Sequence, residues 1–191
     1  MRTDQQKISE SCSICRTAAA FQAYRELYGP ARDPEPALMT HPDDSKQLGW
    51  DEGLAPWRDG PVTDGEPPPG APPLDFSMNM EAKRLWAVRE EDVVYALEQC
   101  ERARSWNNGV VKHSNLTGGG KAYAGGELRF LKEDQIIING RSGRYKVNDD
   151  KEMRALGHAF RSSGYHVWCM GFDREAGVPY PLCSVDSEWL G

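Results

Sequence analysis

The distribution of proline is the feature that most constrains the fold of this chain. All but two of its 13 prolines lie between Pro30 and Pro73. Because each proline fixes φ and removes a backbone N–H donor, no regular helix or central strand can run through this stretch. The pattern predicts three parts: an N-terminal helix in residues 1–29, an irregular arm or linker in residues 30–75, and a core domain in residues 76–191.

The arm is expected to lie along the surface of the core. Its EPPPGAPP segment predicts an extended, polyproline II conformation. Trp50 and Trp57 stand out from the polar composition of the arm, and large amphipathic rings usually anchor such a segment onto a core. Two alternatives stay open, in which the arm is a proline-rich ligand for another domain or a lid over a site.

The N-terminal part has the pattern of a helix over residues 8–28. Its alanines favour a helix, and Gly29 followed by Pro30 ends it. Cys12 and Cys15 form a CxxC pair, but a structural zinc site needs four ligands and the sequence offers no second pair with suitable spacing. We therefore interpret these cysteines as two thiols on the first turns of a helix, and we predict no metal site.

Charge and cysteine content exclude several classes of protein. With a net charge of -6 and a pI near 5.3, the chain lacks the basic excess that binding to nucleic-acid phosphates requires. No apolar run approaches the roughly 20 residues of a membrane span, and the N-terminal segment MRTDQQKISES has no apolar signal region. Five cysteines, an odd number, favour reduced thiols. We expect a cytoplasmic protein that binds neither nucleic acid nor membrane, with a small anionic ligand or another protein as its partner.

The core domain is predicted to have an α+β fold, a small antiparallel or mixed sheet with flanking helices. Between Glu90 and Arg104 the acidic residues precede the arginines, as the dipole of a helix prefers. Asn139 and Gly140 indicate a turn between two strands. The predicted elements are a strand at 84–88, a helix at 90–104, three strands within 109–147, a helix from 149 or 150 to 163, and a strand at 165–172.

Most polar residues at predicted strand ends fall between Gly109 and Val147. A carboxylate beside glycines, with a histidine and an arginine nearby, is a cluster that positions a ribose or another polar substrate. Arginine also suits an anionic group. The alternative is a solvent-exposed hairpin edge whose charges prevent pairing with other strands. The predicted catalytic residues are His113, Glu127 and Tyr145, and the predicted substrate-binding residues are Lys112, Ser114, Lys121, Arg141 and Ser142.

Two familiar catalytic motifs are excluded by their spacing. Gly118–Lys121 is not a P-loop, because the GxxxxGK[ST] spacing is absent and a strand is expected to follow. We favour a flexible hairpin loop there over an anion-binding nest of glycine amides. His113 and Ser114 are neighbours on a predicted strand and point to opposite faces, and no GxSxG elbow is present, so a serine hydrolase is not indicated.

The segments KHS, AGGE and SGRY resemble a domain found at the C-terminal ends of bacterial polymorphic toxins and related effectors. The resemblance covers residues 109–147, and it carries over to His113, Ser114, Glu127, Ser142 and Tyr145. The chain departs from the pattern at Arg144, where a histidine is usual. A catalytic role that depends on that histidine therefore does not carry over to this chain. The resemblance implies an α+β effector-type domain without naming the reaction.

These patterns lead to two main hypotheses. The first is a small effector-type enzyme, a transferase acting on a nucleotide-like or other anionic substrate, with ADP-ribosyl transfer as its most concrete form. The second is a non-catalytic acidic interaction protein, inhibitor or immunity-like, that binds a protein partner through its arm. A metal-dependent enzyme is a third hypothesis, but the four histidines and five cysteines lack metal-ligand spacing. No particular cofactor is indicated.

Overall fold

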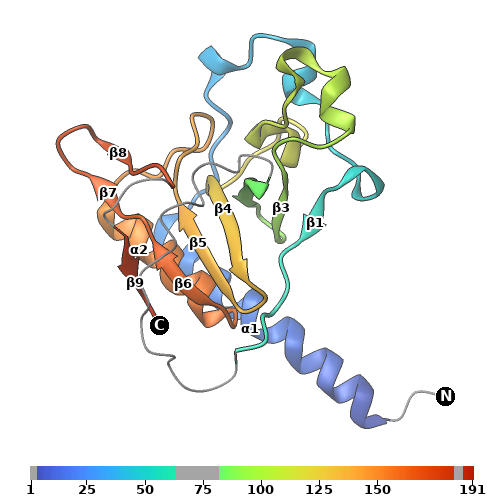
Figure 1. Ribbon diagram of the computed structural model, residues 1–191, viewed down its shortest axis with the longest axis vertical. Helices are drawn as coiled ribbons and strands as arrows, with labels where there is room; N and C mark the ends of the chain where they lie inside the picture. The colour runs from blue at the N-terminus through green and yellow to red at the C-terminus, as the bar shows by residue number, and fades with distance from the viewer. Residues whose placement is uncertain (1–3, 63–81, 183–186) are drawn as a thin grey trace.

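The structure is a computed structural model that describes residues 4–62, 82–182 and 187–191, with side chains from Arg16 onward. It confirms the α+β fold class. Within the described residues, helices α1 (Asp4–Tyr28) and α2 (Asp150–Ser162) accompany a seven-stranded sheet and a two-stranded sheet (Figure 1). The large sheet contains β1 (Ala55–Pro56), β2 (Arg84–Val88), β3 (Val93–Leu97), β4 (Ala124–Lys132), β5 (Gln135–Asn139), β6 (His166–Cys169) and β9 (Glu188–Trp189). The small sheet pairs β7 (Phe172–Asp173) with β8 (Val178–Pro179).

The large sheet is mixed, with the strand order β1-β3-β2-β4-β5-β6-β9. Neighbouring strands are antiparallel except for β5 and β6, which are parallel because α2 carries the chain back between them. α2 begins where the sequence predicts, and the Asp149 carboxylate caps it by accepting a hydrogen bond from Glu152 N at 2.8 Å.

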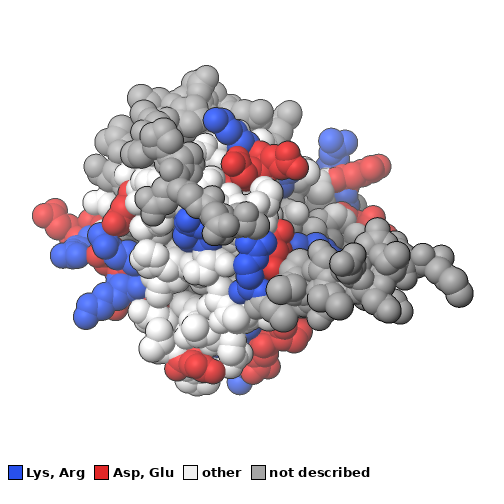
Figure 2. Space-filling model, turned by 90° about the horizontal axis from the view of Figure 1, so that it is seen from below, with Lys and Arg blue, Asp and Glu red and all other residues white. Residues whose placement is uncertain are grey.

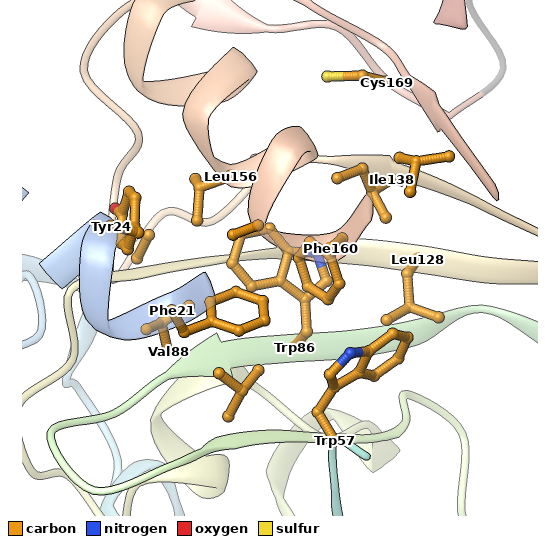
Figure 3. Close-up of a cluster of buried hydrophobic side chains, with 14 of the residues drawn as sticks. Phe21, Tyr24, Trp57, Trp86, Val88, Leu128, Ile138, Leu156, Phe160 and Cys169 are labelled. Carbon is orange, nitrogen blue, oxygen red and sulfur yellow. The ribbon is translucent and has the colours of Figure 1, made fainter. Parts of the chain in front are cut away.

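Both helices pack on one face of the sheet and form the main core with it. Phe160 of α2 lies edge-on to Trp86 of β2 and to Phe21 of α1, with ring centroids 5.3 and 5.0 Å apart (Figure 3). The two faces of the sheet follow from strand alternation. Trp86 therefore faces the helices, while Leu85 and Ala87 face the opposite side.

The opposite face is covered by segments without regular strands or α-helices. Leu48 and Leu54 of the arm and Leu116 of a 3-10 helix cover the part beneath β2 and β3. Near the C-terminus, Leu182 packs in a small apolar cluster that includes Ile137 of β5. Because both faces are covered, the continuous apolar run of β5 is buried on each side, as the sequence predicts.

The arm follows the surface of the core between residues 30 and 62. Its backbone forms hydrogen bonds along its length, first with Ala122 before β4 and with the loop after β5. Further along, it bonds to the 3-10 helix His113–Leu116, to β3 and to the end of α2. Trp57 is 5% exposed and packs in the main core, whereas Trp50 is 56% exposed under the guanidinium of Arg89. Trp57 therefore anchors the arm to the core as predicted, whereas Trp50 does not. The EPPPGAPP segment lies outside the described residues.

A buried carboxylate joins the start of the arm to both helices. Glu152 of α2 accepts hydrogen bonds from Tyr24 Oη of α1 at 2.8 Å and from Arg32 of the arm at 3.0 Å. Its other oxygen accepts from the backbone and side-chain nitrogens of Asn148, at 2.7 and 2.8 Å. Four hydrogen bonds therefore compensate for removing this charge from water.

Three predicted elements are wrong. The helix predicted at 90–104 is the strand β3 followed by a 3-10 helix, because Val93, Val94 and Tyr95 pair with β2 after a turn closed by Arg89 N and Asp92 O at 2.9 Å. The strand predicted to start near Gly109 is replaced by short 3-10 helices, and 141–147 is a loop. Apolar spacings of three and four occur in a strand followed by a turn as well as in a helix, so periodicity did not separate the two.

Candidate functional site

Apart from Lys121, which lies on a separate loop before β4, the predicted site residues lie on the sheet face opposite the helices. They come from the 3-10 helix His113–Leu116, from β4, and from the loop of residues 140–148. The 3-10 turn buries both His113 and Ser114, so the expectation that they point to opposite faces of a strand is wrong. Ser114 Oγ is fully buried and has no hydrogen-bond partner in the described part of the chain.

Glu127 occupies the centre of this face. Its Oε1 accepts a hydrogen bond from Lys83 Nζ at 3.0 Å, and its Oε2 accepts one from Asn139 Nδ2 at 2.8 Å. Lys83 also pairs with Glu98 at 2.9 Å. The Glu127 side chain remains 18% exposed. We call Lys83, Glu98, Glu127 and Asn139 the carboxylate cluster.

The charge of Lys83 is secured by its two partners. Burial lowers the pKa of Lys83, but the hydrogen bonds and charges of Glu98 and Glu127 outweigh this effect, and the net pKa is raised. The ammonium group therefore stays charged and separates two carboxylates that would otherwise repel each other.

His113 lies next to the carboxylate cluster as a neutral imidazole. Its Nε2 is 2.9 Å from Gly126 O, and since a carbonyl only accepts, Nε2 carries the proton. Burial lowers the pKa of His113 to about 4, against the opposing effects of the Gly126 carbonyl and the Glu127 charge. At neutral pH this side chain is a weak base, so it is better suited to holding the β4 backbone than to removing a proton.

Glycine at position 125 lets His113 and Ser142 approach β4 together. A Cβ added at Gly125 would lie 2.8 Å from His113 Cδ2 and 3.1 Å from Ser142 Oγ. The first distance is too short for any side chain. The structure thus brings together His113, Glu127 and Ser142 from three segments of the chain.

Tyr145 braces the loops around the site. Its hydroxyl donates to Gly120 O at 2.6 Å and lies 2.7 Å from Thr117 Oγ1. Ser142 Oγ accepts a hydrogen bond from Tyr145 N at 3.0 Å, which closes the turn of the 140–148 loop. Burial raises the pKa of Tyr145. Both side chains therefore have partners within the protein.

Lys112 is engaged by an acidic residue of the arm. Asp44 is 1% exposed, and its Oδ1 contacts Lys112 Nζ at 2.7 Å and Arg144 Nη2 at 3.4 Å. Burial alone would raise the pKa of Asp44, but the hydrogen bonds from Lys112 and the His41 amide and the two cationic charges outweigh it, so the pKa is lowered. Arg144 thus ties the loop to the arm.

Lys121 and Arg141 have exposed side chains. Lys121 lies 3.9 Å from Asp33, away from Glu127, whereas Arg141 directly follows the carboxylate cluster, with its N–H donating to Asn139 Oδ1 at 3.1 Å. The glycines before Lys121 do not form an open anion nest. Gly119 N and Gly120 N donate to Ser114 O and Thr117 O, and the loop packs against Ser45 and Gln47 of the arm.

Sequence reasoning missed four residues that shape the site: Asp44, Lys83, Glu98 and Asn139. Asn139 was interpreted as a turn residue, but the β4–β5 register places it directly opposite Glu127. Lys83 and Glu98 flank the β2–β3 hairpin, which the sequence did not predict. Asp44 lies far from Lys112 in sequence, so no local signal connects them.

A separate hollow of about 720 Å³ lies on another part of the surface. Its walls are residues 17–25 of α1, residues 56–59 of the arm and residues 90–93 of the β2–β3 turn. We call it the α1 groove. Figure 2 shows the whole molecule from below. Lys and Arg side chains lie beside Asp and Glu side chains around an uncharged middle, so neither sign dominates the described residues of the face seen in that view.

The described residues contain neither a cluster of metal ligands nor a candidate membrane-spanning helix. Across 4–62, 82–182 and 187–191, no group of three or more His, Cys, Asp or Glu side chains is placed to hold a metal ion. The side chains of Cys12 and Cys15 lie outside the described part. Among the described helices, none combines the length and apolar character of a membrane span.

Comparison with protein-family models, curated proteins and solved structures finds no match to this chain. The functional proposal therefore rests on the residues around Glu127 and on the α1 groove.

Proposed function

We propose that this chain is a small effector-type enzyme that acts on a nucleotide-like substrate at the carboxylate cluster, with Glu127 as its catalytic carboxylate. The observation that carries the proposal is the way Glu127 is held. Lys83 and Asn139 bind its two oxygens separately, yet the side chain stays partly exposed. A catalytic carboxylate needs this combination of fixed direction and access to substrate.

ADP-ribosyl transfer is the reaction we propose in its most concrete form. The bond between the ribose and the nicotinamide of NAD breaks, and the electron pair leaves with nicotinamide. Positive charge develops on the ribose, and the Glu127 carboxylate stabilises it electrostatically while accepting a hydrogen bond from a ribose hydroxyl. The acceptor nucleophile, or water, then bonds to the ribose carbon that nicotinamide left and gives up its proton to solvent water. Arg141, exposed beside the cluster, suits the pyrophosphate.

His113 has a different role in this proposal from the one predicted. With a pKa of about 4 it carries no charge at neutral pH and accepts a proton poorly. Its Nε2–H fixes the carbonyl of Gly126, the residue before Glu127. We therefore assign it to positioning the β4 backbone.

The variant Glu127→Gln tests the proposal. The rate of nicotinamide release from NAD should fall by at least about 100-fold, because the glutamine amide of the variant lacks the negative charge that stabilises the positive charge developing on the ribose. The melting temperature should change little, since Lys83 keeps its pairing with Glu98. Release at the wild-type rate in the variant rules out Glu127 as the catalytic carboxylate, and no release by the wild-type protein rules out ADP-ribosyl transfer.

The α1 groove favours a second function, binding of a protein partner. Its apolar floor includes Phe21, Trp57 and Val93, and Glu90 and Glu91 are exposed at the β2–β3 turn. Arg25 also lines the groove, but its guanidinium donates to the carbonyls of the same turn. The exposed Arg58 lines the other side of the groove, so the exposed acidic charge is confined to the β2–β3 turn. The groove suits a peptide segment that places an apolar side chain on the floor and a basic one beside Glu90 and Glu91.

Deleting the arm cannot test this second function, because Trp57 belongs to the main core. Instead, a Lys-rich amphipathic peptide should shift the NMR signals of residues 17–25 and 90–93, while a Glu-rich peptide of the same length should not. The double variant Glu90→Lys, Glu91→Lys should remove the shifts. Equal shifts with both peptides, or none with either, would reject the partner site.

A further inference from the structure

We propose that Asn139 is a positioning residue that sets the direction of the Glu127 carboxylate and couples it to the loop that carries Arg141. This inference rests on the proposed function and deepens it, because it names the group that aligns the catalytic carboxylate with the anion-binding side chain. No sequence signal assigned a functional role to Asn139.

The register of the sheet puts the two side chains together. Glu127 of β4 and Asn139 of β5 are directly opposite partners in an antiparallel pair. Opposite partners project from the same face of a sheet. Since Leu128 and Ile138 pack in the core on the helix side, Glu127 and Asn139 both face the other side.

Asn139 uses both ends of its amide, and only one orientation of the amide fits. Its Oδ1 accepts from Glu127 N at 3.0 Å and from Arg141 N at 3.1 Å, and its Nδ2 donates to Glu127 Oε2 at 2.8 Å. Turning the amide over would place its oxygen against the carboxylate and its nitrogen against two N–H donors. The side chain is completely buried, so water cannot replace these bonds.

Lys83 cannot fix the direction of the carboxylate alone. An ammonium group is a point charge on a flexible stem with three rotatable donors, and here it is shared between Glu98 and Glu127. The planar amide of Asn139, attached by a short side chain to a buried strand, restricts the carboxylate more closely. A small rotation of a catalytic group lowers a reaction rate strongly, because the reacting atoms must be aligned.

The same amide places Arg141 relative to Glu127. Arg141 begins the exposed part of the 140–148 loop, and its N–H shares Asn139 Oδ1 with the N–H of Glu127. The bond therefore fixes the backbone of Arg141 beside Glu127, and the exposed Arg141 side chain can reach an anionic group of a substrate whose hydroxyl binds Glu127. This arrangement fits a nucleotide in which a ribose hydroxyl and a phosphate are close neighbours.

Two variants separate a positioning role from a purely structural one. Asn139→Asp is isosteric and keeps an oxygen that accepts from the two backbone amides, but when ionised it loses the donor to Glu127. Asn139→Ala removes all three bonds. The control is Asn148→Ala, which removes an amide donor to the buried Glu152 on the helix side of the molecule.

The measurements are kcat and KM for nicotinamide release from NAD, with melting temperatures for every variant. Both Asn139 variants should lower kcat by about 10-fold or more, because the alignment of Glu127 is lost. KM should change little in Asn139→Asp, which keeps the bond to Arg141 N, and should rise in Asn139→Ala, which loses that bond. Asn148→Ala should keep the wild-type kcat even where its melting temperature falls. If Asn139→Asp does not fold, Asn139→Ser replaces it.

Glu127→Gln is measured in parallel, so that the two ideas fail separately. An active Glu127→Gln overturns the proposed function, and the positioning role of Asn139 falls with it. An inactive Glu127→Gln together with wild-type kcat in the Asn139 variants overturns the positioning role alone. A loss of activity in Asn148→Ala as large as in Asn139→Ala would show that the effect is general destabilisation, and it would also overturn the inference.

Discussion

His113 shows how burial changes the chemistry of a single residue. In the sequence it is a plausible acid–base catalyst, because an ordinary histidine titrates close to neutral pH. In the structure the ring is enclosed beside β4, and burial lowers its pKa to about 4. The consequence is a neutral hydrogen-bond donor that holds Gly126 in place.

The lowered pKa of His113 predicts a dependence of stability on pH. The histidine of the unfolded chain takes up a proton near its ordinary pKa of 6.5, while the folded chain resists protonation down to about pH 4. Between these values falling pH favours the unfolded state, so the contribution of His113 is present above 6.5 and is lost by pH 4. The loss is about 3 kcal/mol in unfolding free energy.

Urea unfolding between pH 7 and pH 4 checks this prediction. His113→Gln keeps a nitrogen donor for Gly126 O but does not titrate, so its unfolding free energy should fall by less over the same range. The exposed His158→Gln controls for the loss of a histidine. Equal losses of stability in the wild-type protein and in His113→Gln would contradict the prediction.

At the scale of elements, the arm is part of the fold rather than an appendage. It supplies β1, which pairs with β3, and Trp57, which contacts Phe160 at a centroid distance of 4.9 Å. Trp57 Nε1 also donates to Ser163 Oγ at 2.9 Å, at the end of α2. The prolines limit regular structure in the described part of the arm to 3-10 helices and the two-residue strand β1, but backbone hydrogen bonds and buried side chains still connect it to the core.

The two arm tryptophans predict very different effects of substitution. Trp57→Ala should lower the unfolding free energy by about 3–5 kcal/mol, because it leaves a cavity among buried aromatic rings. Trp50→Ala is the matched control and should cost no more than about 1 kcal/mol, since only its contact with Arg89 is lost. Urea unfolding curves of both variants give these values. Equally small effects would show that the arm does not fold together with the core.

At the scale of the whole molecule, the candidate site lies where three parts of the chain meet. The sheet contributes Glu127, the 3-10 helix contributes His113, and the arm contributes Asp44, which binds Lys112 and Arg144. The helices cover the other face of the sheet and leave this one to irregular segments (Figure 1). The α1 groove lies apart from the site, so the enzyme and partner-binding functions can be tested independently.

The sequence by itself determined the local features of this protein. Its prolines excluded α-helices and central strands from residues 30–62, its Asp149 and apolar spacing specified α2, and its apolar residues specified β2 and β5. It also indicated His113 and Ser142, which pack together against β4 at Gly125. These features depend on neighbours in the sequence, through backbone geometry, capping and side-chain alternation.

Only the tertiary structure decided what each of these residues touches. The β2–β3 hairpin, the pairing of Asn139 with Glu127, and the contact of Asp44 with Lys112 join residues through strand register and chain reversal. Burial, which sets the pKa of His113, is likewise a property of the packed molecule. Such contacts leave no local pattern, because hydrogen bonds and exclusion of water depend on distances in space rather than on separation along the chain.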